Sequence, residues 1–250
     1  MALAAVAVLG RFVKSRGSGD PKGPDNDAEV EIVGIRLLQQ NAIHGYFHPG
    51  GNELVIDALG ADVFYDVASI DLAGNTLREY TAGAAGIHQR HNGWPTWSRD
   101  GQYVVFQRQE AQHYLDGVPA LGMPGLGLFN NLWATGADGS APTQLTDIPI
   151  KLTQSDGIPV QGVVHPVFSH DGSTLMWTER YDRGGTNDWG LWRVRMARFV
   201  VAEEAPSLAD VRTLIPPAAP HASRSCARCA PAAGRARASV PPRAESRPCR

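Results

Sequence analysis

The chain has 250 residues, of which 43% are hydrophobic, and it carries a formal net charge of −2 at pH 7. This hydrophobic content is enough for a packed core, and 27 glycines with 18 prolines are typical of a turn-rich β protein. Without residues 216–250 the chain has 16 basic and 24 acidic residues, and this mildly acidic body argues against a nucleic-acid-binding surface built from lysine and arginine. We therefore expect no nucleic acid partner.

The N-terminal segment, residues 1–29, is expected to be a disordered linker or the remnant of an export signal. Its apolar stretch, residues 2–10, is much shorter than the roughly 20 residues that cross a bilayer, so no transmembrane segment is predicted. The stretch resembles the hydrophobic part of a signal peptide, although no basic residue precedes it. With an export signal the protein is periplasmic or extracellular, and without one it is cytoplasmic.

Residues 30–215 contain one short sequence motif three times. The motif is an aromatic residue, a tight glycine turn and a hydrophobic strand. The copies lie at residues 46–56, 96–106 and 167–177, with turn glycines Gly51, Gly101 and Gly172. The Asp-Gly turns in the second and third copies supply the positive φ that tight hairpins need. Repetition of one such unit is typical of radial or linear repeat proteins.

A second hairpin follows each of the first two copies. Gly74 and Gly139 occupy the same turn of this hairpin, and Thr81 and Thr146 end the same strand. After the third copy, residues 191–196 are strand-like, whereas residues 202–209 could be helical. The unit is thus two hairpins, or four antiparallel strands, which is typical of a propeller blade.

Two prolines, Pro95 and Pro166, are expected just before the first strand of their units, where a missing N–H costs no ladder hydrogen bond. Six apolar positions recur in the repeats and are expected to form the packing between blades, although a ligand-stacking surface is the alternative. These positions are Phe47, Trp97, Phe168, Ile56, Phe106 and Trp177.

The motif PTWSRDGQYVVF at residues 95–106 resembles the P-x-W-S-P-D-G-x-x-I-x-F repeat of TolB-like β-propellers. Residues 166–172 look like a second copy, with His170 where the family has proline. The resemblance covers roughly residues 43–215. It implies an all-β fold, a propeller of four-stranded antiparallel blades that binds a protein or a small ligand on its faces.

About three blades are found, which makes the expected propeller incomplete. Because propeller blades cover one another around a closed ring, three blades would leave two apolar sheet faces uncovered. Either further blades are missing from this product or two chains associate.

The C-terminal segment, residues 216–250, is expected to be a disordered tail rich in arginine, alanine, proline and cysteine. It holds seven arginines and one acidic residue, and all three cysteines of the chain, Cys226, Cys229 and Cys249. The body consequently has no disulfide. This composition is what a GC-rich gene gives when read out of frame, so a truncated or frameshifted product is one hypothesis.

Four histidines, His44, His88, His91 and His165, precede or enter the first strand of a unit. Some TolB-like enzymes that degrade pectate carry a metal on histidines that face the channel. The resemblance thus implies a possible divalent-metal site of His88, His91 and His165 with Gln89, and no other cofactor. The alternative is that these histidines hydrogen-bond to turn backbone.

Two further segments are expected to be loops. Residues 109–131 interrupt the second unit and predict a long surface loop that could contact a partner. Residues 181–188 form an acidic loop whose spacing matches no EF-hand.

Three functions remain open from the sequence. The leading hypothesis is a non-enzymatic, TolB-like binding module for a protein or small ligand. The alternatives are a metal-dependent propeller lyase or hydrolase with histidines at the channel mouth, and a truncated fragment without independent function.

Overall fold

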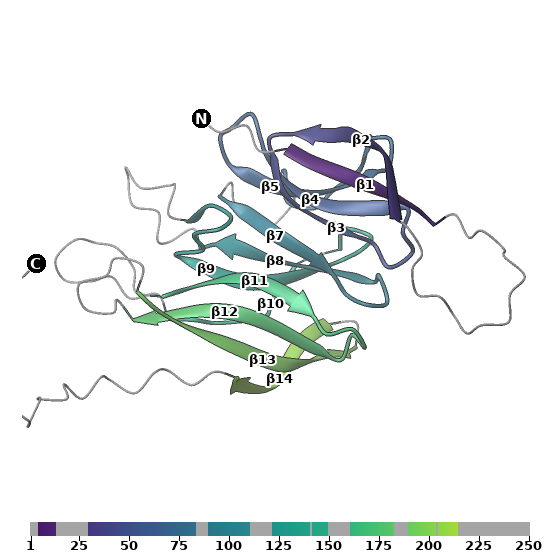
Figure 1. The fold of residues 1–250 in the computed structure, drawn as a ribbon. Helices are drawn as coiled ribbons and strands as arrows, with labels where there is room; N and C mark the ends of the chain where they lie inside the picture. Colours follow the sequence, from purple (N-terminus) through teal and green to yellow (C-terminus); the bar gives the residue numbers. More distant parts are fainter. Residues whose placement is uncertain are drawn as a thin grey trace, which may run out of the picture. The chain divides into compact units, whose positions relative to one another are not determined.

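The computed structural model describes residues 5–13, 30–83, 90–110, 122–140, 142–149, 161–182, 190–203 and 205–214. Within these ranges the regular structure is almost entirely β (Figure 1). The N-terminal sheet has two strands, β1 (Ala5–Val13) and β2 (Val30–Gln40). Strand β1 lies in the segment expected to be a linker or signal remnant, and the sequence does not anticipate it.

Three four-stranded antiparallel sheets follow. The first sheet is β3 (Ala42–Phe47), β4 (Glu53–Leu59), β5 (Tyr65–Asp71) and β6 (Thr76–Glu79). The second is β7 (Asn92–Trp97), β8 (Tyr103–Gln109), β9 (Asn130–Gly136) and β10 (Thr143–Gln144). The third is β11 (Gly162–Phe168), β12 (Thr174–Asp182), β13 (Leu191–Ala202) and β14 (Ala205–Thr213). In each sheet neighbouring strands are consecutive in the chain, so the predicted four-stranded unit is confirmed.

The repeated sequence motif forms the same hairpin in all three sheets. The N–H of Gly51, Gly101 and Gly172 donates to the carbonyl three residues earlier, at 2.8–2.9 Å. All three glycines have positive φ, between 71° and 78°, which an L side chain rarely adopts. The predicted turn is therefore confirmed, including in the first copy, where glycine replaces aspartate before the turn glycine.

The sheets pack face to face through the predicted apolar positions. Val55 and Val67 of the first sheet contact a cluster with Trp97, Val104 and Phe106 of the second. On the other face of the second sheet, a cluster joins it to the third sheet; its buried members are Val105, Leu132, Ala134, Val163, Leu175, Trp177 and Ala197. The second sheet is thus covered on both faces.

One of the six recurring apolar positions departs from the expectation. Phe47 is 51% exposed, whereas Trp97 at the same place in the second sheet is 5% exposed. Trp97 is covered because it packs against Tyr80 of the preceding sheet. Among the described residues no four-stranded sheet precedes the first sheet, and the residue of β2 that packs on it, Leu38, covers the cluster of Leu54 and Ile56 instead.

Strand β2 reaches this cluster through a close backbone approach. Gly74, in the β5–β6 turn, has φ +90°, and a Cβ there would lie 2.6 Å from the carbonyl oxygen of Leu38. Leu54 and Ile56 are each only 2% exposed. The outer face of the first sheet is therefore capped within the chain.

The C-terminal part of the third sheet corrects a second expectation. Residues 202–209 could be helical from sequence, but β13 ends at Ala202 and β14 begins at Ala205, so the described residues of this segment are largely strand. The pairing of Val200 with Ser207 and of Val201 with Pro206 makes this a β-hairpin. The apolar side chains of β13 pack on the neighbouring sheet, and this tertiary packing overrides the weak local helix preference.

The segment between β8 and β9 departs from the expected surface loop only in its described part, since residues 111–121 lie outside the described residues. Its described part, residues 122–129, packs into the body: Leu128 is 8% exposed and Phe129 is 1% exposed. Gly127 lies so close to the backbone of Val163 that a Cβ would not fit between them. These residues therefore support the first strand of the third sheet.

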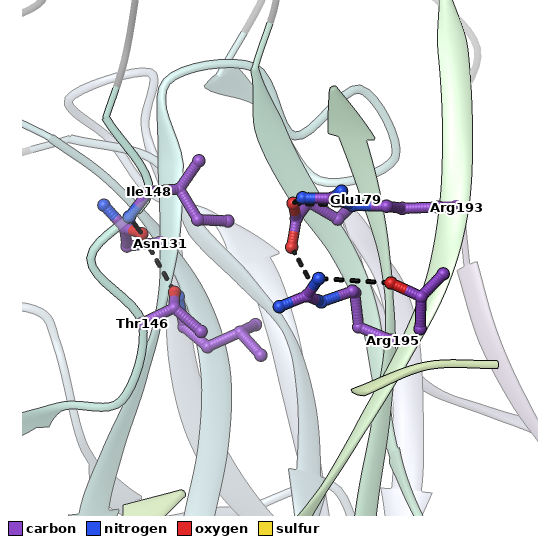
Figure 2. Close-up of polar contacts among 8 residues, drawn as sticks. Asn131, Thr146, Ile148, Glu179, Arg193 and Arg195 are labelled. Carbon is purple, nitrogen blue, oxygen red and sulfur yellow. Dashed lines mark hydrogen bonds and ion pairs between the residues drawn. The ribbon is translucent and has the colours of Figure 1, made fainter. Parts of the chain in front are cut away.

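The strand ends predicted to be equivalent are confirmed in detail. The hydroxyl oxygen of Thr81 accepts from the N–H of Val67, and that of Thr146 accepts from the N–H of Leu132, at 2.8 and 2.9 Å. The hydroxyl of Thr81 also donates to the side chain of Asp66. The hydroxyl of Thr146 donates in the same way to the side chain of Asn131 (Figure 2).

The third sheet carries a different polar contact at the place of Asn131. Arg193 there forms an ion pair with Glu179, which is only 5% exposed (Figure 2). Arg195 approaches the other carboxylate oxygen at 3.5 Å and donates to the hydroxyl of Thr213 at 3.2 Å. Two guanidinium groups thus compensate the buried carboxylate and tie β12, β13 and β14 together.

We expect Phe106→Ala to lower the free energy of unfolding by about 3–5 kcal/mol, because it leaves a cavity at the interface of the first and second sheets. Phe47→Ala, at an exposed position of the repeat, is the matched control and should cost much less. Urea unfolding of the three chains measures both values. Equal losses would contradict the sheet-on-sheet packing.

Candidate functional site

The first strand of each sheet is interrupted at the same place in the repeat. The register shifts between Ala42 and Gly45 in β3, between Gly93 and Thr96 in β7, and between Val164 and Val167 in β11. These irregularities are β-bulges, which re-aim a side chain and are common near functional sites.

The bulges place the prolines differently from the expectation. Pro95 and Pro166 lie inside β7 and β11, not before them. The bulge explains how a strand tolerates them, because the ladder is already broken there. The residues just before these prolines, Trp94 and His165, have positive φ of 49° and 59°.

Three rings at the bulges contact one another in a row. His44, Trp94 and His165 occupy the same position in the three repeats. The rings of His44 and Trp94 are stacked with centroids 3.7 Å apart, and His165 meets Trp94 edge-on with centroids 3.5 Å apart. The Trp94 indole N–H also donates to the hydroxyl of Tyr46 at 3.2 Å. We call His44, Trp94 and His165 the ring column.

Asp57 of β4 holds the ring column together. Its side chain is fully buried and accepts four hydrogen bonds. One oxygen accepts from the backbone N–H of Ile43 (3.3 Å) and of His44 (2.8 Å). The other accepts from His44 Nδ1 (2.8 Å) and from the backbone N–H of Trp94 (2.7 Å). Asp57 therefore fixes the bulges of two sheets at once.

The contact with Asp57 sets the proton arrangement of the His44 ring. Because a carboxylate accepts, Nδ1 of His44 carries the proton in this hydrogen bond, and in the neutral ring Nε2 is left as an acceptor. At the other end of the column, burial lowers the pKa of His165 below its ordinary value, and the nearby His44 lowers it further. Both effects favour the neutral form of His165.

A cleft of about 220 Å³ lies where the first strands of the three sheets end. It is lined by one turn or strand end from each sheet: Tyr46, Phe47 and Pro49; Thr96, Trp97 and Arg99; Val167, Phe168, Ser169 and His170. We call it the strand-end cleft. Arg99 and His170, which are exposed, lie in equivalent turns next to these apolar side chains. The lining contains two cationic or titratable nitrogen groups and no acidic residue.

The predicted metal-site residues are only partly within the described structure. His88 and Gln89 lie outside the described residues. His91 is 5% exposed, and its Nδ1 accepts from the N–H of Tyr65 at 3.3 Å. Its ring also contacts Phe64, whereas His165 contacts Trp94. Among the described residues, no three histidine, cysteine or acidic side chains form a group that could hold a metal.

Sequence reasoning singled out His44 and His165 but missed Asp57 and Trp94. The signal for Trp94 was the shared position of 44, 94 and 165 counted back from the recurring aromatic residue. For Asp57 the sequence holds no comparable signal, because glutamine and threonine occupy its place in the other two repeats, Gln107 and Thr178.

Comparison with known proteins concerns the fold. No protein-family model matches the chain, and no curated protein matches it. Among solved structures, it is similar to a putative TolB from Agrobacterium tumefaciens, with 20% identity and a TM-score of 0.47. That match covers 72% of this chain and 52% of the other. No helix within the described ranges has the length and apolar character needed to cross a membrane.

Two further matches have similar coverage of this chain. TolB from Acinetobacter baumannii has 11% identity and a TM-score of 0.42, over 68% of this chain and 34% of the other. A prolyl endopeptidase structure has 15% identity and a TM-score of 0.44, over 74% and 23%. The chain thus spans about half or less of the length of these proteins. Its three consecutive four-stranded antiparallel sheets have the strand arrangement of propeller blades, and they do not close into a ring within the described residues.

We expect Asp57→Ala to destabilise the fold by at least about 3 kcal/mol, because it leaves several buried N–H donors without an acceptor. The matched control is Asp71→Ala. Asp71 also accepts from two backbone N–H groups, of Ala73 and Asn75, but on an exposed turn where water replaces it. Urea unfolding compares the two, and nitrogen NMR of His44 should show loss of the Nδ1–H form in the Asp57 variant only. A stable variant with unchanged His44 would contradict this role of Asp57.

Proposed function

We propose that the chain is a non-enzymatic, TolB-like binding module that takes its ligand at the strand-end cleft. The observation that carries the proposal is the composition of this cleft: apolar side chains from three equivalent turns, with Arg99 and His170 beside them. Phe47 and Val167 are exposed there, at 51% and 37%. Apolar walls with a few convergent polar groups are typical of ligand sites.

The lining favours a ligand that joins an apolar group to an anionic one. Phe47, Val167 and Phe168 provide apolar surface, and the Arg99 guanidinium provides a planar fork suited to a carboxylate. A volume of about 220 Å³ is below the roughly 300–1,000 Å³ of sites for larger small molecules. It suits one side-chain-sized group with its carboxylate, as in a small acid or the C-terminal residue of a protein partner.

Binding of N-acetyl-phenylalanine and of its amide tests this proposal. We expect the carboxylate to bind more tightly, and Arg99→Gln to weaken it about two- to fivefold, the range of an exposed ion pair. Phe47→Ala should weaken both probes. Arg36→Gln, an exposed arginine in β2, is the control. Calorimetry or NMR titration measures the affinities. Equal binding of acid and amide, or no binding at millimolar concentration, would overturn the proposal.

The second candidate function is a metal-dependent propeller lyase or hydrolase that uses His88, His91 and His165 with Gln89. It rests on the sequence resemblance, and the lowered pKa of His165 is compatible with it, because a histidine must be neutral to bind a metal. His91 would have to bind through Nε2, since its Nδ1 accepts a backbone hydrogen bond.

Zinc or manganese titration separates this candidate from the binding module. The metal site predicts saturable binding that His165→Ala abolishes and that His170→Ala, an exposed histidine on the following turn, leaves intact. Absence of saturable binding in the unchanged chain would remove the candidate.

A further inference from the structure

The turns that carry Arg99 and His170 are in direct contact. The two residues occupy the same place in the β7–β8 and β11–β12 turns, two residues before the turn glycine. A Cβ added to Gly172, the glycine of the β11–β12 turn, would overlap the side-chain stem of Arg99. The guanidinium of Arg99 and the imidazole of His170 therefore belong to adjoining turns and line one cleft.

Asp171, the acidic residue next to His170, is bound within its own turn. Its Oδ1 accepts from the hydroxyl of Ser169 at 2.6 Å and from the N–H of Ser173 at 3.0 Å. These hydrogen bonds, with that of Ser169 as the largest contribution, lower the pKa of Asp171 to about 2. The Asp171 carboxylate therefore keeps its charge between about pH 5 and 8, the range in which histidines titrate.

The other charged groups around the β11–β12 turn are bound to partners of their own. Asp100, in the neighbouring turn, accepts from the hydroxyl of Ser98 at 2.6 Å. On β13, Arg198 lies opposite Thr174 at the end of the turn, and its guanidinium donates to Asp210 at 2.7 Å. These groups add no charge change to the cleft in the same pH range.

A second histidine, His48, lies in the β3–β4 turn. Its Nδ1 accepts from the N–H of Gly50 at 2.9 Å, and its ring meets Trp97 edge-on. The strand-end cleft is lined by His170 and not by His48. His48 is therefore a suitable comparison for His170.

His170 is the side chain of the cleft that can change its charge near neutral pH. The other titratable side chains of the lining are Tyr46 and Arg99. Tyrosine and arginine ordinarily keep one charge state between about pH 5 and 8, whereas histidine changes its charge there. Protonation of His170 adds a second positive charge beside the Arg99 guanidinium. A bound carboxylate offsets the repulsion between these two charges and is attracted by both.

We propose that His170 shares the carboxylate of the ligand with Arg99, so that the strand-end cleft binds an anionic ligand more tightly at mildly acidic pH than at pH 8. This inference rests on the proposed function, because it requires a carboxylate ligand in the cleft. Both groups are exposed, so the gain from protonation is about two- to fivefold in affinity. By linkage, a bound carboxylate raises the proton affinity of His170 by the same factor.

Calorimetric titration of the full chain with N-acetyl-phenylalanine between about pH 5.5 and 8 tests the inference. The affinity should fall about two- to fivefold as the pH rises, whereas the affinity for the amide should stay constant. His170→Gln should bind the acid with the weaker affinity at every pH. Arg99→Gln should lower the affinity but keep its pH dependence. His48→Gln is the matched control and should behave like the unchanged chain.

NMR of the histidine rings gives a second readout in the unchanged chain. The spectrum of His170→Gln identifies the His170 signals by their absence. Saturation with the acid should move the midpoint of the His170 titration upward by about 0.3 to 0.7 pH units, the logarithm of the same factor. Saturation with the amide should leave this midpoint in place.

Failure of this inference can be distinguished from failure of the proposed function. If the acid binds more tightly than the amide but with the same affinity at every pH, His170 does not contact the ligand and the proposed function stands. Persistence of the pH dependence in His170→Gln leads to the same conclusion. If neither probe binds at any pH, the proposed function is wrong, and the role of His170 is wrong with it.

Discussion

A four-stranded antiparallel sheet with two apolar faces is stable in water only when both faces are covered. In this chain the second sheet meets that condition fully, since Val104 and Phe106 lie against the first sheet and Val105 and Leu132 against the third. Burial of such side chains contributes about 1.5–3 kcal/mol each, so these two interfaces dominate the stability of the described fold. The places of the other elements follow from them. Leu38 of β2 covers Leu54 and Ile56 on the outer face of the first sheet, and the turns at the ends of the first strands line a common cleft.

The polar interior depends on the same packing. Asp57 is completely buried, yet each of its oxygens accepts hydrogen bonds, and the N–H of Trp94 reaches it from the neighbouring sheet. A buried carboxylate of this kind is tolerated only where its partners are fixed in place. The ring column is positioned by Asp57 and by the bulges, and both require the first two sheets to be packed together. The contact thus links the stability of the sheet interface to the geometry of the rings beside the first strands.

The parts of the fold that could be predicted from sequence are local. Gly101 needs a positive φ, and Thr81 and Thr146 each follow their N–H donor in the same hairpin by 14 residues, so the spacing of the repeat identifies them. The bulge at Trp94 and the role of Asp57 could not be predicted, because Asp57 accepts from a backbone group 37 residues later in another sheet. Burial of Phe47 was predicted wrongly for a related reason. The repeat pattern gives its place in the strand but not whether a sheet precedes it. The position of the metal-site residues His88 and Gln89 stays a prediction.

The cap on the first sheet has a consequence for the colloidal behaviour of the protein. A repeat whose two end faces are complementary and both exposed can add copies without limit and grow into a filament. Here Leu38 occupies one of those faces, held by the approach of its carbonyl to Gly74. A side chain at position 74 would push β2 away and uncover Leu54 and Ile56. Gly74 therefore helps to keep Leu54 and Ile56 covered, which disfavours end-to-end association through this face.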